Sequence, residues 1–328
     1  MPNLLFLNAK EVRADLSMEM CMNAMAQAAR ALYTGHVGAP LRSFTPLAGE
    51  RGVLAMMPAA AADPPVFGIK TLSLLPANPA EGRPAIQGLI ALFNHHTGAP
   101  CAIIDGASVT AIRTAAASGL ATRTLAKKGA RTHGILGTGV QSLSHAEAVL
   151  TACPQLQETR IWGRDFNKAK AAANRLQEAL KSPVVAVEDR ANATRCDVVS
   201  AVTASPTPLI EHSNVCPGAH INLVGSHTPN KREACSQTMA QARLYVDGRE
   251  AALSEAGDIV IPLAEGVINH DHIIAELGAV LSGEAQGRTT PDDITVYKSL
   301  GNAAQDLFAA WTLYCHAKQA GTGQQLAM

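Results

Sequence analysis

The sequence predicts an α/β fold in which a domain with a parallel sheet is inserted into a second, α+β domain. From about residue 131, short apolar runs typical of strands alternate with helical stretches, which is the pattern of βαβ units. The part of the chain before it instead holds a long amphipathic helix and two long apolar strands, and the chain after residue 300 is helical again. We therefore expect residues 1–125 and 302–328 to form the outer domain and residues 126–301 to form the inserted one.

The elements of the inserted domain follow one another with short connections. A strand over 133–139 ends in a glycine turn, and a helix is expected over 142–153. A second strand over 159–164 leads into a helix over 165–181. Further strands are expected over 183–188, 196–204, 219–226 and 242–247.

The outer domain is predicted from both ends of the chain. A helix over 17–35 is amphipathic, strands over 66–76 and 85–94 pair or meander, and a helix over 301–321 follows the inserted domain. Residues 107–122 are nearly all Ala, Ser, Thr or Gly, a composition that lets a helix pack closely against its neighbours.

Composition excludes several classes of function. The chain has 27 basic and 27 acidic residues and only 4% aromatic residues, so it lacks the basic stripe of a nucleic-acid-binding surface. No apolar run approaches the ~20 residues of a membrane-spanning helix. The N-terminus has no basic region ahead of its short apolar stretch, unlike a signal peptide. We expect neither a nucleic-acid partner nor a membrane partner.

The cysteines and the clustered histidines do not follow a metal-site pattern. The seven cysteines are widely scattered and include no CxxC pair, so we expect reduced thiols in a cytoplasmic protein. His95–His96 and His270-Asp271-His272 have no supporting carboxylate or cysteine at ligand spacing. They are predicted to be solvated or structural, and we expect no bound metal.

A glycine turn lies between the first strand and the first helix of the inserted domain. It has the form G-x-G-x-x-S, with an apolar strand before it, a helix after it and a second strand about 20 residues on. Glycines permit the tight turn and let a pyrophosphate approach the helix N-terminus. The pattern predicts a Rossmann domain that binds a dinucleotide through Gly137, Thr138, Gly139, Val140 and Gln141. The alternative is a plain glycine turn of an α/β protein.

The end of the second strand predicts which nucleotide binds. An acidic residue there would bind the ribose 2′-hydroxyl of NAD, but this chain has Arg164 followed by Asp165. Arg164 is placed to pair with a 2′-phosphate, whereas Asp165 is expected to cap the following helix. We expect NADP(H) to be preferred, with NAD(H) possible.

Two cations stand among small or apolar residues. Arg113 lies in the small-residue helix, and Lys70 lies on the apolar strand 66–76. A buried, unpaired guanidinium costs several kcal/mol, so Arg113 either reaches the surface or binds an anion. A carboxylate or phosphate of a ligand would satisfy both cations through charge-assisted hydrogen bonds.

The chain resembles the ornithine cyclodeaminase/μ-crystallin family over nearly its whole length. The stretches that carry the resemblance are LRSFTPL, LAMMPA, FGIKTLSLLPANP, TAIRTAAASGLAT, GTGVQS, IWGRD, VGSHTPNKRE and VYKSLGNAAQD. The resemblance implies two domains, a homodimer and nicotinamide-dependent chemistry on small α-amino or α-imino acids. It also implies that Arg42, Lys70 and Arg113 bind the carboxylate of the substrate, and it places Thr114 beside the cofactor.

Two positions depart from the pattern of the ornithine cyclodeaminases. Those proteins carry an aspartate where this chain has His227, and a glutamate where this chain has Ala55. The acids suited to the ammonium groups of a diamine are therefore absent. The GS-x-TP-x-x-RE segment is similar to that of ketimine reductases, which implies reduction of Δ1-pyrroline-2-carboxylate to L-proline or of Δ1-piperideine-2-carboxylate to L-pipecolate.

The remaining candidates complete the predicted site. Lys70 and His227 are the catalytic candidates, and His227 either protonates the imine or only lines the pocket. Gln87 is a further candidate contact to the substrate. The residues expected near the nicotinamide are Thr203, Ser205, Lys298 and Ser299.

Other functions remain open at this point. Ornithine cyclodeamination, alanine dehydrogenase activity, and NADPH-dependent binding of a small carboxylate without turnover would each retain these motifs. The sequence does not rank five-membered against six-membered rings.

Overall fold

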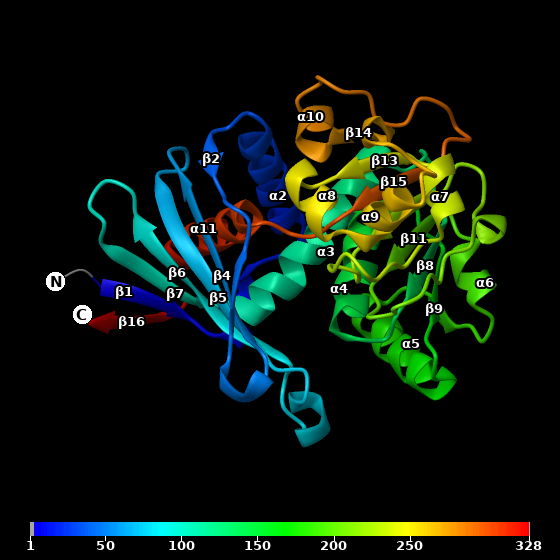
Figure 1. The fold of residues 1–328 in the computed structure, drawn as a ribbon. Coiled ribbons are helices and arrows are strands. Elements are labelled where there is room, and N and C mark those ends of the chain that lie inside the picture. Colours follow the sequence, from blue (N-terminus) through cyan, green and yellow to red (C-terminus); the bar gives the residue numbers. More distant parts are fainter. Residues whose placement is uncertain (1–2, 328) are drawn as a thin grey trace. The chain divides into compact units, whose positions relative to one another are not determined.

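Two units make up the chain in the computed structural model, which describes residues 3–327 (Figure 1). The outer unit runs up to Arg113 and resumes at Gly301, and the inserted unit spans Thr114–Leu300. Helix α3 (Gly106–Leu125) leads from one unit into the other. The boundary predicted at residues 125 and 126 coincides with the end of α3 and stays a prediction.

The outer unit is built on one mixed sheet in the order β16-β1-β7-β6-β5-β4-β2, with β3 also paired to β4. Its pairs are antiparallel except for β1 with β7. The strands are β1 (Asn3–Leu7), β2 (Val37–Gly38), β3 (Ser43–Pro46), β4 (Val53–Ala61), β5 (Val66–Leu74), β6 (Ile86–Asn94), β7 (Pro100–Asp105) and β16 (Gln324–Ala327). The predicted pairing of the two long apolar strands is confirmed, because β5 and β6 pair along their whole length.

Helices of the outer unit pack against this sheet. They are α1 (Ala9–Asp15), α2 (Met18–Tyr33) and α11 (Ala303–Ala320), with short 3-10 turns at Ala48–Glu50 and Asn78–Glu81. The Ser17 hydroxyl caps α2, whose buried residues recur at helical spacing, and the Asn302 side chain caps α11. Helix α11 contacts α2 and strands β4, β5 and β6, so it places its first turn against the strand that carries Lys70.

The inserted unit has a parallel sheet in the order β10-β9-β8-β11-β12-β15-β13-β14. Its strands are β8 (Thr132–Leu136), β9 (Glu158–Trp162), β10 (Val184–Ala186), β11 (Val198–Ala201), β12 (His220–Leu223), β13 (Arg243–Val246), β14 (Ile273–Glu276) and β15 (Thr295–Lys298). The chain reverses direction across the sheet between β8 and β11, and parallel sheets bind ligands beyond the carboxyl ends of their strands at such a point. The predicted α/β fold is confirmed.

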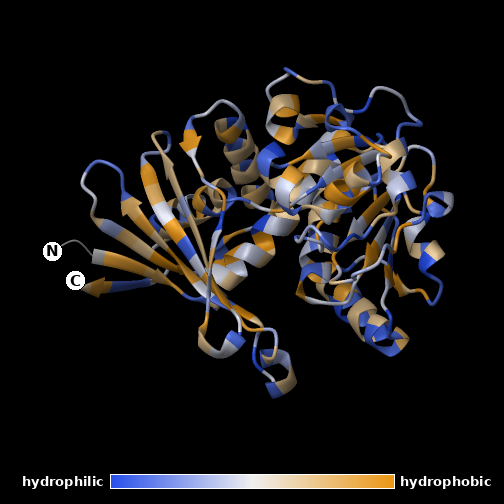
Figure 2. Cartoon of the chain, in the orientation of Figure 1, coloured by the Kyte–Doolittle hydropathy of each residue, from blue (hydrophilic) through white to orange (hydrophobic). Residues whose placement is uncertain are grey.

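Helices and short turns connect the parallel strands. Beside α3 they are α4 (Val140–Ala152), α5 (Phe166–Leu180), α6 (Arg190–Thr194), α7 (Ser236–Gln241), α8 (Arg249–Glu255), α9 (Gly257–Ala264) and α10 (Leu277–Leu281), with 3-10 turns at His212–Asn214 and His270–His272. The strands are apolar, and α5 alternates between hydrophobic and hydrophilic residues as a half-exposed helix does (Figure 2). Across residues 3–327, no helix is both long and apolar enough to cross a membrane.

Candidate functional site

The outer unit holds a group of charges, here called the cation cluster: the buried Lys70, Arg113 and Asp306, with the half-buried Arg42. The side chains of Lys70 and Arg113 are only 1% and 6% exposed. One carboxylate serves both, because Asp306 Oδ2 lies 2.6 Å from Lys70 Nζ and Asp306 Oδ1 accepts a hydrogen bond of 2.9 Å from Arg113 Nε. The alternative that Arg113 is a surface residue is therefore wrong.

Neighbouring groups orient the cations of the cluster. Arg113 donates from a terminal nitrogen to Gln305 Oε1 at 2.9 Å, and Lys70 Nζ donates to the hydroxyl of Thr110 at 3.4 Å. Arg42 donates to the carbonyl oxygen of Gly301 at 3.2 Å. Gly301 cannot carry a side chain, because a Cβ there would lie 2.3 Å from the Arg113 guanidinium and its φ is +76°.

The cluster keeps a surplus of positive charge. Lys70 and Arg113 share the single Asp306 carboxylate, so an added carboxylate would meet charge-assisted donors in a largely desolvated place. Burial lowers the pKa of Lys70 to about 8, against the opposing effect of Asp306. At neutral pH, Lys70 is therefore a protonated amine whose pKa lies close to the ambient value, as suits a general acid.

Gln87 does not join the cluster. It pairs with Ser73 across β5 and β6, whereas Lys70 pairs with Ile90. Because side chains alternate between the two faces of a strand, Lys70 and Ser73 point to opposite faces of the sheet. Gln87 pairs with Ser73 and therefore lies on the face opposite to Lys70. The structure therefore does not bring Gln87 together with Lys70, and its contact with the substrate stays a prediction.

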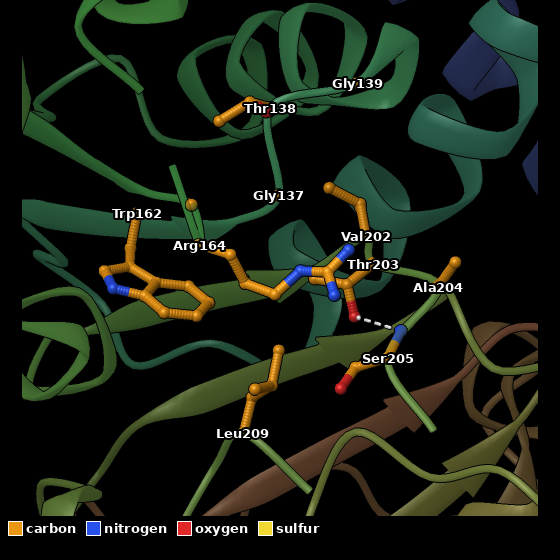
Figure 3. A pocket seen from close by; sticks show the side chains of 11 residues that line it. Gly137, Thr138, Gly139, Trp162, Arg164, Val202, Thr203, Ala204, Ser205 and Leu209 are labelled. Atoms are coloured by element: carbon orange, nitrogen blue, oxygen red, sulfur yellow. Dashed lines mark hydrogen bonds between the residues drawn. The ribbon is translucent and has the colours of Figure 1, made fainter. Parts of the chain in front are cut away.

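The inserted unit contains a pocket of about 330 Å³ beyond the carboxyl ends of β8, β9 and β11, here called the nucleotide pocket (Figure 3). Glycines allow it to form: Gly137 has a φ of +119°, and a Cβ there would lie 2.8 Å from the Val202 carbonyl oxygen. A Cβ at Gly163 would lie 2.7 Å from the Thr138 side chain. The pocket is lined by Gly137, Thr138, Gly139, Trp162, Gly163, Arg164, Val202, Thr203, Ala204, Ser205 and Leu209.

The predicted turn residues stand at the start of α4. Gly139 is the N-cap of this helix, and Val140 is its first residue and 78% exposed. The Gln141 Oε1 atom is buried and has no hydrogen-bond partner among the described residues. The Ser142 hydroxyl bonds the Gly139 carbonyl at 2.7 Å, so this serine packs the turn closely, as predicted. The first N–H groups of α4 are therefore available to an anion.

Two cations flank a second hollow at the mouth of the nucleotide pocket. Arg164 is exposed at the end of β9, and Figure 3 shows its side chain extended across the pocket. Together with Thr138, Asp165 and Lys168 it lines a hollow of about 400 Å³. Asp165 accepts hydrogen bonds from the N–H groups of Asn167 and Lys168, so its predicted role as the cap of α5 is confirmed. Sequence analysis did not identify Lys168, which stands one helical turn after Arg164.

Hydrogen bonds hold the walls of the nucleotide pocket. The Thr203 hydroxyl accepts a hydrogen bond of 3.2 Å from Ser205 N–H, drawn in Figure 3, and the Ser205 hydroxyl donates to the Thr207 carbonyl at 2.8 Å. The Trp162 indole donates to the Glu188 carbonyl at 3.1 Å. Thr203 and Ser205 therefore lie in the pocket wall, and their place near the nicotinamide stays a prediction.

The structure places the other candidates of the inserted unit differently. His227 is exposed, and its Nδ1 donates to the Gly225 carbonyl oxygen at 3.1 Å. Lys298 is fully buried and pairs with Asp258 at 3.0 Å, and Ser299 is 1% exposed near Asp247. Neither Lys298 nor Ser299 lines the nucleotide pocket, and their contact with the nicotinamide stays a prediction. Thr114 is half-buried on α3.

Cysteines and histidines form no metal centre in the described part of the chain. Its seven cysteines are free thiols. No group of three or more His, Cys, Asp or Glu side chains within residues 3–327 is arranged to hold a metal ion. The His272 ring bonds the Met239 carbonyl oxygen at 2.7 Å.

Comparison with known proteins gives a match along the chain. The model of the ornithine cyclodeaminase/mu-crystallin family matches residues 3–321. The chain is 34% identical to a Delta(1)-pyrroline-2-carboxylate reductase of Bacillus cereus, over 98% of this chain and 99% of that protein. It is 36% identical to the ketimine reductase mu-crystallin of Mus musculus, over 94% of this chain and 96% of that protein.

Solved structures have the same fold. A Delta(1)-pyrroline-2-carboxylate reductase of Thermococcus litoralis, in complex with NADH and L-proline, superposes with a TM-score of 0.94 at 33% identity, covering 98% of this chain and 100% of that one. An archaeal alanine dehydrogenase dimer with bound NAD has a TM-score of 0.92 at 30% identity, covering 99% of both chains.

The cation cluster predicts a large dependence of stability on Asp306. In Asp306→Asn, Lys70 and Arg113 stay buried without their counter-charge, so we expect the free energy of unfolding to fall by about 3–5 kcal/mol. Urea unfolding measures it. In the control Glu81→Gln, which breaks the exposed pair with Arg83, the change should stay within about 0.5 kcal/mol. A loss below about 1 kcal/mol in Asp306→Asn would show that the carboxylate does not hold the cluster.

Proposed function

We propose, from the premise that this chain belongs to the ornithine cyclodeaminase/mu-crystallin family, that it reduces the C=N bond of a cyclic α-imino carboxylate. The proposed substrates are Δ1-pyrroline-2-carboxylate and Δ1-piperideine-2-carboxylate, with L-proline and L-pipecolate as products. The cation cluster carries the proposal, because its two buried cations, Lys70 and Arg113, share the one carboxylate of Asp306 and can receive a second one. The names of the similar proteins and the complex of one of them with NADH and L-proline support it.

The nucleotide pocket fits a nicotinamide dinucleotide. Gly137 and Gly163 leave a cradle that a Cβ would fill, and the free N–H groups at the start of α4 suit a pyrophosphate. The residues proposed to hold the nucleotide are Thr114, Gly137, Thr138, Gly139, Val140, Gln141, Arg164, Thr203 and Ser205, to which we add Lys168. When bound, the reduced nicotinamide supplies a hydride to the imine carbon.

The substrate carboxylate is proposed to bind Arg42, Lys70 and Arg113. Each charge-assisted hydrogen bond in a buried place contributes about 1.5–3 kcal/mol. Asp306 and Gln305 hold the Arg113 guanidinium in one orientation before the substrate arrives. The protein therefore contributes by fixing the carboxylate, and with it the adjacent imine carbon, in one place.

Two groups are proposed to hold protons for the reaction. Lys70 Nζ is protonated below its pKa of about 8 and carries a proton that an imine nitrogen needs when it becomes an amine. His227 is the second candidate. Its Nδ1 proton is engaged with the Gly225 carbonyl oxygen, so the exchange of a proton with substrate would use Nε2.

A homodimer and a cytoplasmic location are also proposed. The similar alanine dehydrogenase is described as a dimer. The outer unit of this chain exposes the large apolar side chains of Leu41, Phe44, Ile86 and Leu89, which an interface would cover. The reduced thiols expected from the cysteine pattern support a cytoplasmic location.

Turnover with a panel of substrates tests the function. We expect the purified protein to oxidise NADPH with either cyclic imine, and to release little or no ammonia from L-ornithine with oxidised nucleotide. Arg113→Ala should lower kcat/KM by at least about a hundredfold, the effect of losing a buried charged partner. The exposed control Arg83→Ala should leave it unchanged. Turnover of pyruvate with ammonia alone would make the protein an alanine dehydrogenase, and binding of nucleotide and imine without turnover would make it a binding protein.

The pH profile tests Lys70. Its pKa is lowered to about 8, so the protonated form, which binds the carboxylate and donates the proton, is present below pH 8 and disappears above it. We expect kcat/KM to fall as pH rises through about 8. Lys70→Arg keeps the charge and cannot lose its proton, so it should be slower and lack this limb. If kcat/KM of Lys70→Arg still falls as pH rises, the group that titrates is on the substrate and not Lys70.

Nucleotide selectivity tests Arg164. Its loss removes a charge-assisted contact to a 2′-phosphate, so Arg164→Ala should raise the KM for NADPH by about 10–100-fold and leave the KM for NADH nearly unchanged. The matched control is Lys170→Ala on α5, since that ammonium lies 4.2 Å from the centre of the Phe166 ring. An equal rise for both nucleotides in Arg164→Ala would remove the proposed preference for NADP(H).

A further inference from the structure

A single buried carboxylate joins the segments that follow β11 and β12. The Glu233 side chain is fully buried. Its Oε1 accepts hydrogen bonds from the N–H and the hydroxyl of Thr203, each 2.8 Å long. Its Oε2 accepts one of 2.7 Å from the N–H of Gly225. The two oxygens of one side chain therefore serve two different segments.

The backbone of Glu233 fixes the far end of the first segment. Its carbonyl oxygen accepts hydrogen bonds from Leu209 N–H at 2.7 Å and from Ile210 N–H at 2.9 Å. Thr203 and Leu209 both line the nucleotide pocket (Figure 3). This wall of the pocket is thus attached at both ends to one residue, by the side chain at Thr203 and by the backbone at Leu209.

The second segment presents His227. Gly225 donates its N–H to Glu233 and accepts the hydrogen bond of the imidazole Nδ1 on its carbonyl oxygen. A Cβ at Gly225 would lie 1.9 Å from the Thr203 carbonyl oxygen and 2.6 Å from Glu233 Oε1. Only glycine brings the two segments this close, and the imidazole is oriented through a residue that the Glu233 carboxylate holds.

A buried ion pair holds the backbone at Glu233. Asp258 Oδ1 accepts hydrogen bonds from the N–H groups of Glu233 and Ala234, at 2.7 and 3.0 Å. Its Oδ2 pairs with Lys298, which also donates to the Ser226 carbonyl. Asp258 and Lys298 are fully buried, so this ion pair is shielded from solvent. Through this bond to the Ser226 carbonyl, Lys298 helps to hold the segment that carries His227.

We propose that Glu233 is a positioning residue whose two oxygens have separable roles. Oε1 orders the Thr203–Leu209 wall that receives the nucleotide, and Oε2 orders the Gly225–His227 segment that acts on the substrate. The second role rests on the proposed reductase function, whereas the first requires only that a nucleotide binds.

Glu233→Gln separates the two roles because it is nearly isosteric. The amide has one acceptor oxygen and one donor nitrogen. The oxygen satisfies two donors when it faces Thr203 and one when it faces Gly225, so it takes the Thr203 side. The amide N–H groups then face the Gly225 N–H, and this contact is lost. Thr203→Val has the complementary effect, because it removes the hydroxyl that bonds Oε1 and Ser205.

The test compares nucleotide affinity with turnover. We expect Glu233→Gln to change the Kd for NADPH by less than about threefold and to lower kcat by at least about tenfold, the effect of one hydrogen bond to a charged group. Thr203→Val should raise the Kd by at least about tenfold on the same grounds. Ser200→Ala is the control for stability, because it removes a buried hydrogen bond between Ser200 on β11 and His133 on β8 without touching either segment. Ser200→Ala should lower Tm and leave the Kd for NADPH and kcat unchanged.

Amide hydrogen exchange gives a readout that needs no activity. In Glu233→Gln, exchange should become at least about tenfold faster in peptides that cover Gly225–His227, and it should stay unchanged at Thr203–Ser205. This measurement tests the positioning role even if no imine is turned over, in which case only the proposed function fails.

Three results would overturn the proposal. Kd, kcat and exchange could all be unchanged in Glu233→Gln. The Kd could rise while kcat and Tm fall, as would happen if Glu233 only stabilised the fold. The split could also be reversed, with nucleotide affinity lost and turnover kept. A Glu233→Gln protein that does not fold leaves Thr203→Val to decide, and an unchanged Kd there contradicts the role of Oε1.

Discussion

The carboxylate of Asp306 is the constraint on which the outer unit depends. It pairs with Lys70 at 2.6 Å and with Arg113 at 2.9 Å, and all three side chains are nearly devoid of solvent contact. Two such cations placed side by side would repel each other, and each would have lost its hydration. One shared carboxylate makes their burial possible, and the strand β5, the helix α3 and the helix α11 must meet where it stands. The fold and the proposed binding of a carboxylate therefore have the same physical origin.

The inserted unit buries polar groups in a different way, by keeping them neutral. His133, His145 and His220 are fully buried, and burial lowers their pKa values to about 3, 4 and 3. His145 bonds Ser118 of α3, and Asn222, a partner of His220, bonds Thr122 of the same helix. Ser118 and Thr122 of α3 thus face hydrogen-bond partners on α4 and on the parallel sheet, and not solvent. The charged groups of this unit that are fully buried, Glu233, Asp258 and Lys298, gather instead behind the nucleotide pocket.

Local patterns in the sequence predict local structure, and they fail where a partner comes from far along the chain. The glycine turn, the cap at Asp165 and the pairing of β5 with β6 depend on short spacings and were predicted. The outlying charges Lys70 and Arg113 indicated a shared anion, but its source, Asp306, lies 193 residues beyond Arg113. Asp306 and Glu233 each end a stretch that carries the family resemblance, VYKSLGNAAQD and VGSHTPNKRE, but no local pattern gives either residue a role. Asp306 is an acid in the apolar run AAQDLFAAW, and the run NKRE before and at Glu233 resembles a solvated surface. The face on which Gln87 lies and the burial of Lys298 were not predictable for a related reason, since both are set by pairing with distant parts of the chain.

The charge of the cluster also bears on which reaction the site supports. Its surplus is positive, which attracts the carboxylate of an imino acid and repels a second ammonium group such as that of ornithine. Ala55 lies on the same face of the sheet as Lys70, because it pairs with Leu72, and it is 6% exposed. A glutamate at this position would offer an ammonium group its counter-charge, whereas a methyl group offers a cyclic hydrocarbon an apolar contact. Alanine in place of glutamate at position 55 thus removes a counter-charge for a diamine and adds an apolar contact for a ring. The physical chemistry of the outer unit therefore favours reduction of a cyclic imine over cyclodeamination.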